Sequence, residues 1–151
     1  MAITYKYIDP PATPEKGIEF MQNTMLPLLR EYWEKKGKDL YNKDMNFNVI
    51  TFVQMWFMGS LVPVIAYDGD KPIGFFIGVR FVPILYDANA LQAEVWYAPT
   101  QEIEQGMFDY LMTIVGFMNI TEVLIETEEP NAPTIKWRKM NTKVTTRHIK
   151  E

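Results

Sequence analysis

The sequence predicts an α/β (α+β) protein whose central sheet is mixed, mostly antiparallel and flanked by helices. Two apolar runs on either side of the turn "DGDK" predict a hairpin. Stretches with helical spacing stand before and after it, and short strand-like stretches follow the later helices. The chain has 151 residues, of which 48% are apolar, so a substantial core is possible. We expect residues 1–151 to form a single domain.

The first expected elements are a strand and a long helix. Residues 3–9, ITYKYID, alternate and are rich in aromatic and β-branched side chains, as strands are. Thr13 is a suitable N-cap and is followed by Pro14, after which apolar residues repeat at helical spacing. We expect a helix over residues 14–36 with a kink at Pro27, because proline removes a backbone donor.

Residues 42–60, NKDMNFNVITFVQMWFMGS, fit either a buried strand or a buried helix. Their β-branched residues favour a strand, whereas their length favours a helix. We expect a helix that is capped by Asp44 or Asn46 and ended by Gly59. The hairpin of residues 61–81 follows, with glycine in its turn.

The second half of the chain alternates between strands and helices. The expected elements are a strand over 91–99, a helix over 101–119, a strand over 121–129, a short helix over 131–140 and a strand over 142–149. Since room for one strand remains after the last helix, we expect a sheet that is shortened at its C-terminus. Its exposed edge would need a partner chain, for example in a homodimer, or charged edge residues such as Lys143, Arg147 and Lys150.

Composition excludes several classes of protein. The chain has no cysteine, which rules out disulfides and thiolate chemistry, and its single histidine, His148, cannot form a multi-histidine metal site. The net charge of −4 argues against nucleic-acid binding. No apolar run reaches the roughly 18 residues of a membrane helix, and the N-terminus lacks the pattern of a signal peptide. We therefore expect a cytoplasmic protein without a metal, membrane or nucleic-acid partner.

Three stretches resemble the GNAT superfamily of N-acetyltransferases. VIAYDGDKPIGFFIGV, residues 64–79, is similar to the family's hairpin. AEVWYAPTQEIEQGMFDYL, residues 93–111, is similar to its central strand, cofactor loop and helix, and NAPTIKWRKMN, residues 131–141, is similar to its last helix. The resemblance covers nearly the whole chain and rests on order and spacing.

The resemblance implies transfer of an acetyl group from acetyl-CoA to an amine. It implies that two central strands splay and that the pantetheine arm pairs with the first of them, which places it on Val95, Trp96 and Tyr97. The pyrophosphate would lie on N–H groups at a helix N-terminus, where the dipole favours anions. The resemblance further implies that Gln105, Gly106 and Met107, in the helix after the central strand, and Asn131, at the start of the last helix, bind the cofactor.

The resemblance also indicates candidate catalytic residues. Glu94 stands on the central strand, where several family members carry a carboxylate, and is the candidate general base. The position where the family often places a tyrosine acid falls on Trp137, which has no hydroxyl to donate. Tyr97 and Tyr110 are the alternative acids.

The pyrophosphate loop departs from the family pattern. Its basic position falls on Glu102, and its first glycine position falls on Gln105, with Gly106 one place late. Glu102 and Glu104 suit a helix N-terminus but oppose an anion there. The loop is therefore degenerate as a phosphate site.

Two functions remain open. The first is an N-acyltransferase that uses acetyl-CoA to acetylate an amine of a small molecule or a protein. The second is a catalytically degenerate GNAT-like fold, of viral or mobile-element origin, that acts as a protein-binding or structural module. Trp33, Trp56 and Trp96 are the aromatic residues expected to suit protein contacts.

Overall fold

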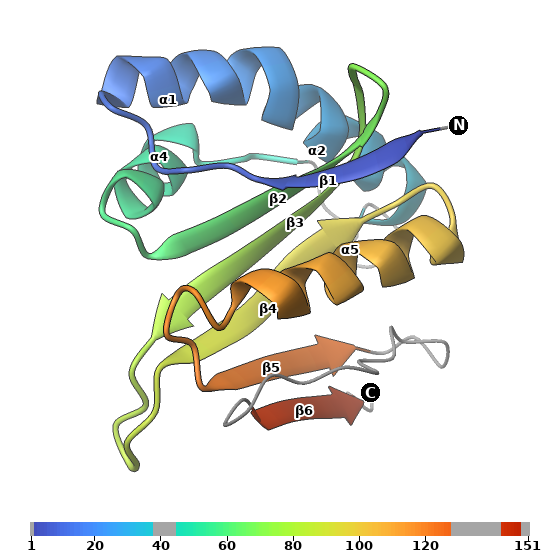
Figure 1. The fold of residues 1–151 in the computed structure, drawn as a ribbon. Helices are drawn as coiled ribbons and strands as arrows, with labels where there is room; N and C mark the ends of the chain where they lie inside the picture. The colour runs from blue at the N-terminus through green and yellow to red at the C-terminus, as the bar shows by residue number, and fades with distance from the viewer. Residues whose placement is uncertain (1, 38–44, 128–142, 149–151) are drawn as a thin grey trace.

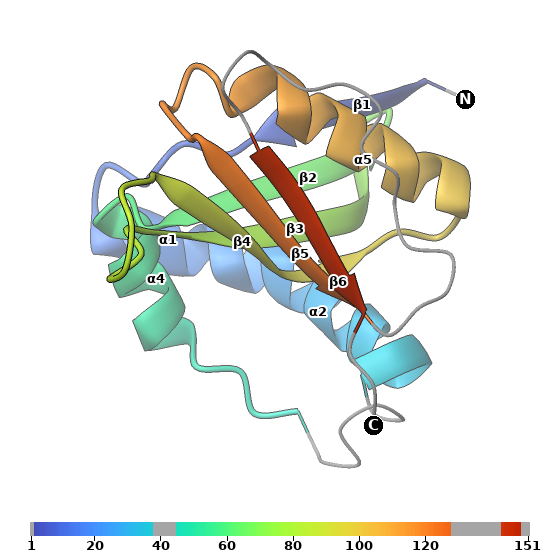
Figure 2. The same ribbon diagram turned by 90° about the horizontal axis from the view of Figure 1, so that it is seen from below.

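The computed structural model describes residues 2–37, 45–127 and 143–148, and these form a sheet flanked by helices (Figures 1 and 2). The strands are β1 (Ile3–Tyr7), β2 (Leu61–Asp68), β3 (Lys71–Phe81), β4 (Ala90–Tyr97), β5 (Glu122–Thr127) and β6 (Lys143–His148), and they lie in this order in one sheet. The pairs from β1 to β4 are antiparallel, whereas β4–β5 and β5–β6 are parallel. The mixed, mostly antiparallel sheet is confirmed, and among the described residues it ends at β6.

The long N-terminal helix consists of four consecutive segments. They are α1 (Pro14–Phe20), the π-helical turn η1 (Met21–Met25), α2 (Leu26–Tyr32) and the π-helical turn η2 (Trp33–Gly37). Thr13 is the N-cap, as predicted, and its hydroxyl accepts a hydrogen bond from the Lys16 N–H at 3.3 Å. The wide turn η1 ends two residues before Pro27, where the proline ring crowds the preceding turn and removes a donor.

The ambiguous stretch before the hairpin is a helix, α4 (Val49–Phe57), as expected from its length. Its cap is neither Asp44 nor Asn46 but Asn48, whose side chain accepts a hydrogen bond from the Thr51 N–H at 3.1 Å. Asn46 is two residues too early to reach these N–H groups, and Asp44 lies outside the described residues. Gly59 follows the helix with φ of 82°, the left-handed conformation that glycine adopts without strain.

The helix after β4, α5 (Gln101–Ile114), is shorter than the predicted 101–119. Beyond Ile114 several backbone hydrogen bonds span three residues instead of the four of an α-helix. Examples are Phe117 N to Ile114 O at 3.0 Å and Met118 N to Val115 O at 3.2 Å. Asn119 then turns with φ of 58°, which asparagine tolerates better than most residues. The last predicted turn of the helix is therefore a loop that leads into β5.

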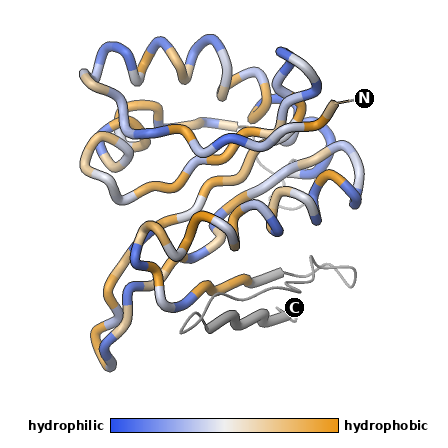
Figure 3. Tube along the Cα trace, in the orientation of Figure 1, coloured by the Kyte–Doolittle hydropathy of each residue, from blue (hydrophilic) through white to orange (hydrophobic). Residues whose placement is uncertain are grey.

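Helices cover both faces of the sheet. One core cluster packs the N-terminal helical segments and α4 against one face of the sheet. Its side chains include Met21, Met25, Trp56, Ile65 and Phe75. The other joins α5 to the opposite face, and its side chains include Phe76, Leu91, Phe108, Leu111 and Ile125. Figure 3 shows hydrophobic residues along the central strands and hydrophilic ones on the outer side of α1.

This packing decides the prediction about the tryptophans, and another prediction lies outside the described residues. Trp56 is a core residue and is not available for protein contacts, whereas Trp33 and Trp96 are half-buried. No helix within the described ranges has the length and apolar character needed to cross a membrane. The predicted helix over 131–140, with Asn131 and Trp137, lies outside the described residues.

Candidate functional site

Strand β4 contains a β-bulge at Glu94. Ala93 lies opposite Gly78 and Val95 lies opposite Ile77, so Glu94 is an extra residue with no partner on β3. Side chains alternate between the two faces of a sheet along a strand. One extra residue therefore moves every later side chain to the opposite face. Ala93 therefore packs on the α5 side of the sheet, whereas Val95 packs on the side of α2. Glu94 itself is exposed at the point of exchange.

The two central parallel strands separate just beyond this bulge. The pairing of β4 with β5 ends at Ala93 and Ile125, although β4 continues to Tyr97 and β5 continues to Thr127. Figure 1 shows the two strands diverging toward their C-terminal ends. Within the described chain, residues 95–97 have no β5 partner, and their backbone edge is open to an extended ligand.

The turn from β4 into α5 is short and well capped. The Thr100 hydroxyl accepts a hydrogen bond from the Ile103 N–H at 3.2 Å, and the Thr100 carbonyl accepts one from the Glu104 N–H at 3.0 Å. The helix therefore begins at Gln101, after a turn formed by residues 98–100. Its first-turn N–H groups, on Gln101 and Glu102, are the ones that a helix leaves for an outside acceptor.

The predicted phosphate-binding residues Gln105, Gly106 and Met107 lie in the second turn of α5. An α-helix pairs the N–H groups of its second turn internally. Met107 is buried in the core, and Gly106 lies against Tyr5 of β1. A Cβ atom at Gly106 would collide with the Tyr5 hydroxyl, so the close packing against β1 favours glycine here.

A cavity of about 330 Å³ lies beside the end of β4 and the start of α5. Its lining residues are Lys35, Lys36, Tyr97, Ala98, Pro99, Thr100, Gln101 and Glu104. The two lysines come from η2, far away in sequence, and they bring positive charge to a turn that has none of its own. Sequence reasoning missed them, because no local pattern links the end of the first helix to the end of β4.

Lys35 is held in place by two side chains. Its Nζ atom forms an ion pair with Glu31 at 2.9 Å and lies 5.9 Å from the centre of the Tyr97 ring. Hydrogen bonds to Glu31 and to Tyr97 raise the pKa of Lys35 above its usual value. The lysine therefore stays charged through the neutral range.

The two acids that appeared to oppose an anion lie in different places. Glu104 lines the cavity and is 8% exposed, and one of its carboxylate oxygens accepts a hydrogen bond from Trp96 Nε1 at 2.5 Å. Glu102 is exposed and does not line the cavity. The pKa of Tyr5 is raised mainly by burial, then by the charges of Asp109 and Glu102, so Glu102 acts on the side of β1.

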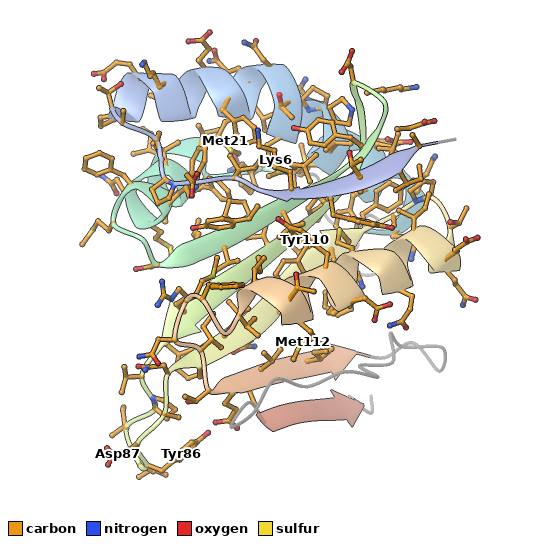
Figure 4. All side chains as sticks on the ribbon, in the orientation of Figure 1. Lys6, Met21, Tyr86, Asp87, Tyr110 and Met112 are labelled. Atoms are coloured by element: carbon orange, nitrogen blue, oxygen red, sulfur yellow. The ribbon has the colours of Figure 1, made fainter. Side chains whose placement is uncertain are left out.

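The candidate acids Tyr97 and Tyr110 are not brought together. Tyr97 is buried, lines the cavity and packs edge-on against Tyr32, with ring centres 6.2 Å apart. Tyr110 stacks on Tyr5, and its hydroxyl accepts a hydrogen bond from the Tyr7 N–H at 2.9 Å. Figure 4 shows Tyr110 between α5 and β1. Neither Tyr110 nor Glu94 lines the cavity.

Comparison of the structure with solved structures identifies the fold. A ribosomal-protein-alanine N-acetyltransferase from Brucella melitensis biovar Abortus 2308 is similar with a TM-score of 0.60 and 14% identity, over 90% of this chain and 83% of that one. An aminoglycoside acetyltransferase from an uncultured soil metagenomic sample, in complex with sisomicin, has a TM-score of 0.58 and 10% identity, over 80% and 74% of the two chains.

A third similar structure is a predicted acetyltransferase with acetyl-CoA from Clostridium acetobutylicum, with a TM-score of 0.57 and 15% identity over 81% of this chain and 79% of that one. No protein-family model and no curated protein matches the sequence. The chain therefore has a GNAT-like acetyltransferase fold, as predicted, and at these identities the likeness shows the fold alone.

Proposed function

We propose that residues 1–151 form a GNAT-like acyltransferase domain that transfers an acetyl group from acetyl-CoA to an amine. The observation that supports this most directly is the opening between β4 and β5 beyond Ala93 and Ile125. A strand edge in the middle of a sheet normally pairs with its neighbour, so an unpaired stretch there is a ready site for an extended ligand. The lysine-lined cavity lies at the end of the same stretch.

The residues around this opening suit the two chemical parts of coenzyme A. The backbone of Val95, Trp96 and Tyr97 would pair with the amide groups of the pantetheine arm, as a neighbouring strand would. The start of α5 and the cavity beside it would receive the phosphates. When bound, acetyl-CoA supplies an activated acetyl thioester.

The proposed proton transfers use groups on or near β4. Glu94 is exposed at the bulge, and its carboxylate would take the proton that the acceptor amine loses on acylation. Of the two candidate acids, Tyr97 is favoured to donate a proton to the leaving group, because it lies on the open half of β4 that would hold the pantetheine arm. The Tyr110 hydroxyl is engaged with β1 on another side of α5.

The acceptor is an amine of a small molecule or of a protein. Similar structures include one acetyltransferase in complex with sisomicin and one named for ribosomal-protein alanine, so both classes of amine belong in an acceptor screen.

The direct test is thermal unfolding with and without millimolar acetyl-CoA, with ATP as a control for general anion binding. A ligand at a hundred times its dissociation constant adds about 2.7 kcal/mol of stability, a shift of several degrees for a domain of this size. We expect a shift with acetyl-CoA and none with ATP. Equal shifts with both ligands, or none with either, would contradict the proposal.

A second candidate function, a protein-binding module, is favoured by an apolar end opposite the cavity. This apolar end consists of Phe57, Met58, Val82, Ile84, Leu85 and Phe117, all of them exposed. Ile84 and Leu85 are 99% and 93% exposed, in the loop between β3 and β4 whose Tyr86 and Asp87 are labelled in Figure 4. Exposed apolar side chains on neighbouring turns can form an interaction site.

Hydrogen bonds from Arg80, at the end of β3, join the turns of the apolar end. The Arg80 N–H donates to the Ser60 carbonyl at 2.8 Å, and the Arg80 guanidinium donates to the Met118 carbonyl at 3.0 Å. If a second copy of the chain binds here, sedimentation should show a dimer that Ile84→Ser with Leu85→Ser abolishes. A monomer with acetyl-CoA binding and turnover would favour the enzyme instead.

A further inference from the structure

The cavity beside the start of α5 contains two basic side chains among its lining residues, Lys35 and Lys36, and one acidic side chain, Glu104. All three belong to elements whose positions are fixed by the core, since Tyr32 and Leu29 of α2 and Ile103 of α5 are buried beside them. The turn that follows β4 supplies no positive charge of its own. Any anion at this turn would therefore depend on the lysines of η2.

We propose that Lys35 and Lys36 bind the phosphate groups of coenzyme A at the start of α5, in place of a basic residue in the loop. The inference rests on the proposed function, because coenzyme A is the ligand that the function requires. It identifies which residues of this chain neutralise the ligand, and it places them on the first helix rather than on the turn after β4.

Lys35 and Lys36 are consecutive residues of the π-helical turn η2, and both line this cavity. The chain packs closely at Gly37, where a Cβ atom would be 2.5 Å from the Trp33 ring. Lys35 is oriented by its ion pair with Glu31 and by the Tyr97 ring, so its ammonium group lies over the end of β4 before any ligand arrives.

A second contribution comes from α5. Its first-turn N–H groups and its helix dipole favour an anion, and the helix has 14 residues, enough for a developed dipole. The Ile103 and Glu104 N–H groups are taken up by Thr100. The lysines and the Gln101 N–H group would then approach a phosphate from two different elements.

The acid in the cavity works against this site but is partly compensated. Glu104 accepts a hydrogen bond from Trp96 Nε1, which stabilises its negative charge next to the cavity. Removal of that charge should therefore strengthen phosphate binding. Glu102 is outside the lining, so its removal provides a matched control of the same charge on the same helix turn.

The test is isothermal titration calorimetry of the full chain with coenzyme A and with pantetheine, which lacks the phosphates. Lys35→Gln with Lys36→Gln should weaken the binding of coenzyme A by about ten- to a hundredfold and leave pantetheine binding unchanged. The salt dependence of coenzyme A binding should also become shallower. Lys16→Gln, on the first turn of α1, is the control lysine and should change neither affinity.

Substitution of the acid in the cavity should change the affinity for coenzyme A in the opposite direction. Glu104→Gln should tighten the binding of coenzyme A severalfold, because the amide keeps an acceptor for Trp96 and removes the charge. Glu102→Gln should leave it unchanged. Melting temperatures of the unliganded variants show whether each one is folded before its affinity is compared.

The outcomes separate this inference from the proposed function. If the wild-type chain binds coenzyme A and the double lysine variant binds it equally well, the lysine assignment is wrong and the proposed function stands. If the wild-type chain binds neither acetyl-CoA nor coenzyme A, the proposed function is wrong. Inorganic diphosphate then decides the inference: binding that the double variant loses keeps the lysines as a phosphate site, and equal or absent binding overturns it.

Discussion

The two edges of strand β4 differ. On its β3 edge, pairing runs from Ala90 to Tyr97 with one bulge, whereas on its β5 edge it stops at Ala93. The chain reaches the β3 edge through an antiparallel connection, and it reaches the β5 edge through α5, which begins after a short turn that follows β4. The half of β4 that lacks a β5 partner is held by its side chains, because Trp96 packs on Phe108 and Tyr97 packs on Tyr32. The sheet can therefore stay open along the β5 edge of β4, because side chains packed on both faces hold this half of the strand in place.

The largest expected effect concerns catalysis at the open edge. If Glu94 is the general base, Glu94→Gln should slow acetyl transfer by about 10²- to 10⁴-fold. Equal turnover for both proteins at every pH would exclude Glu94 from the mechanism and leave its bulge with a structural role.

The largest effect on the free energy of unfolding is expected for a side chain that contacts both β3 and the open half of β4. Phe108 is fully buried and contacts Phe76 of β3 and Trp96 of the open half, with ring centres 5.5 and 5.2 Å apart. Phe108→Ala should lower the free energy of unfolding by about 3–5 kcal/mol, through lost contacts and a cavity. Chemical denaturation measures this, and Phe117→Ala, at an exposed position, should change it by less than about 0.5 kcal/mol.

A smaller effect is expected where α5 meets β1, on the paired side of the sheet. Gly106→Ala should cost about 1–3 kcal/mol, because its Cβ atom would meet the Tyr5 hydroxyl. In a double-mutant cycle, Tyr5→Ala should remove most of that cost. If Gly106→Ala costs the same with and without the Tyr5 side chain, close packing against Tyr5 is not the reason for glycine here. Gln105→Ala, on the same turn, is the control.

The smallest effect concerns alkaline pH. The pKa of Tyr5 is raised in the folded chain, mainly by burial and then by Asp109 and Glu102. Between 10.0 and the folded pKa, the unfolded chain loses this proton first, so stability falls as pH rises. Urea unfolding at about pH 8 and about pH 11 should show a smaller alkaline loss for Tyr5→Phe than for the wild type. If Tyr5→Phe and the wild type lose the same stability at alkaline pH, other tyrosines cause the loss.

Local patterns predicted most of the fold. The hairpin, the strand after it and the cap at Thr13 depend on neighbouring residues, and these elements are present. The cap of α4 was misplaced by a few residues because several asparagines compete in one stretch. The helix α5 was predicted too long because Val115 to Asn119 keep an apolar spacing that tighter backbone bonds override.

The candidate site was predicted less completely, for a physical reason. The open edge at residues 95–97 follows from the order of strands, which the sequence conveys through its resemblance to a known family. The bulge at Glu94 depends on the register with β3, and the lysines of the cavity depend on where the first helix ends in space. Both are long-range properties, so no short motif contains them.

The contacts between β1 and α5 have a consequence for the order of folding. The hydrogen bonds from Tyr5 to Ile103 and from Tyr7 to Tyr110 join residues 98 and 103 positions apart in the chain. During synthesis, the first strand leaves the ribosome long before α5 exists to cover it. Contacts of such long range slow folding, so the N-terminal strand should be among the last parts of the molecule to become protected from hydrogen exchange.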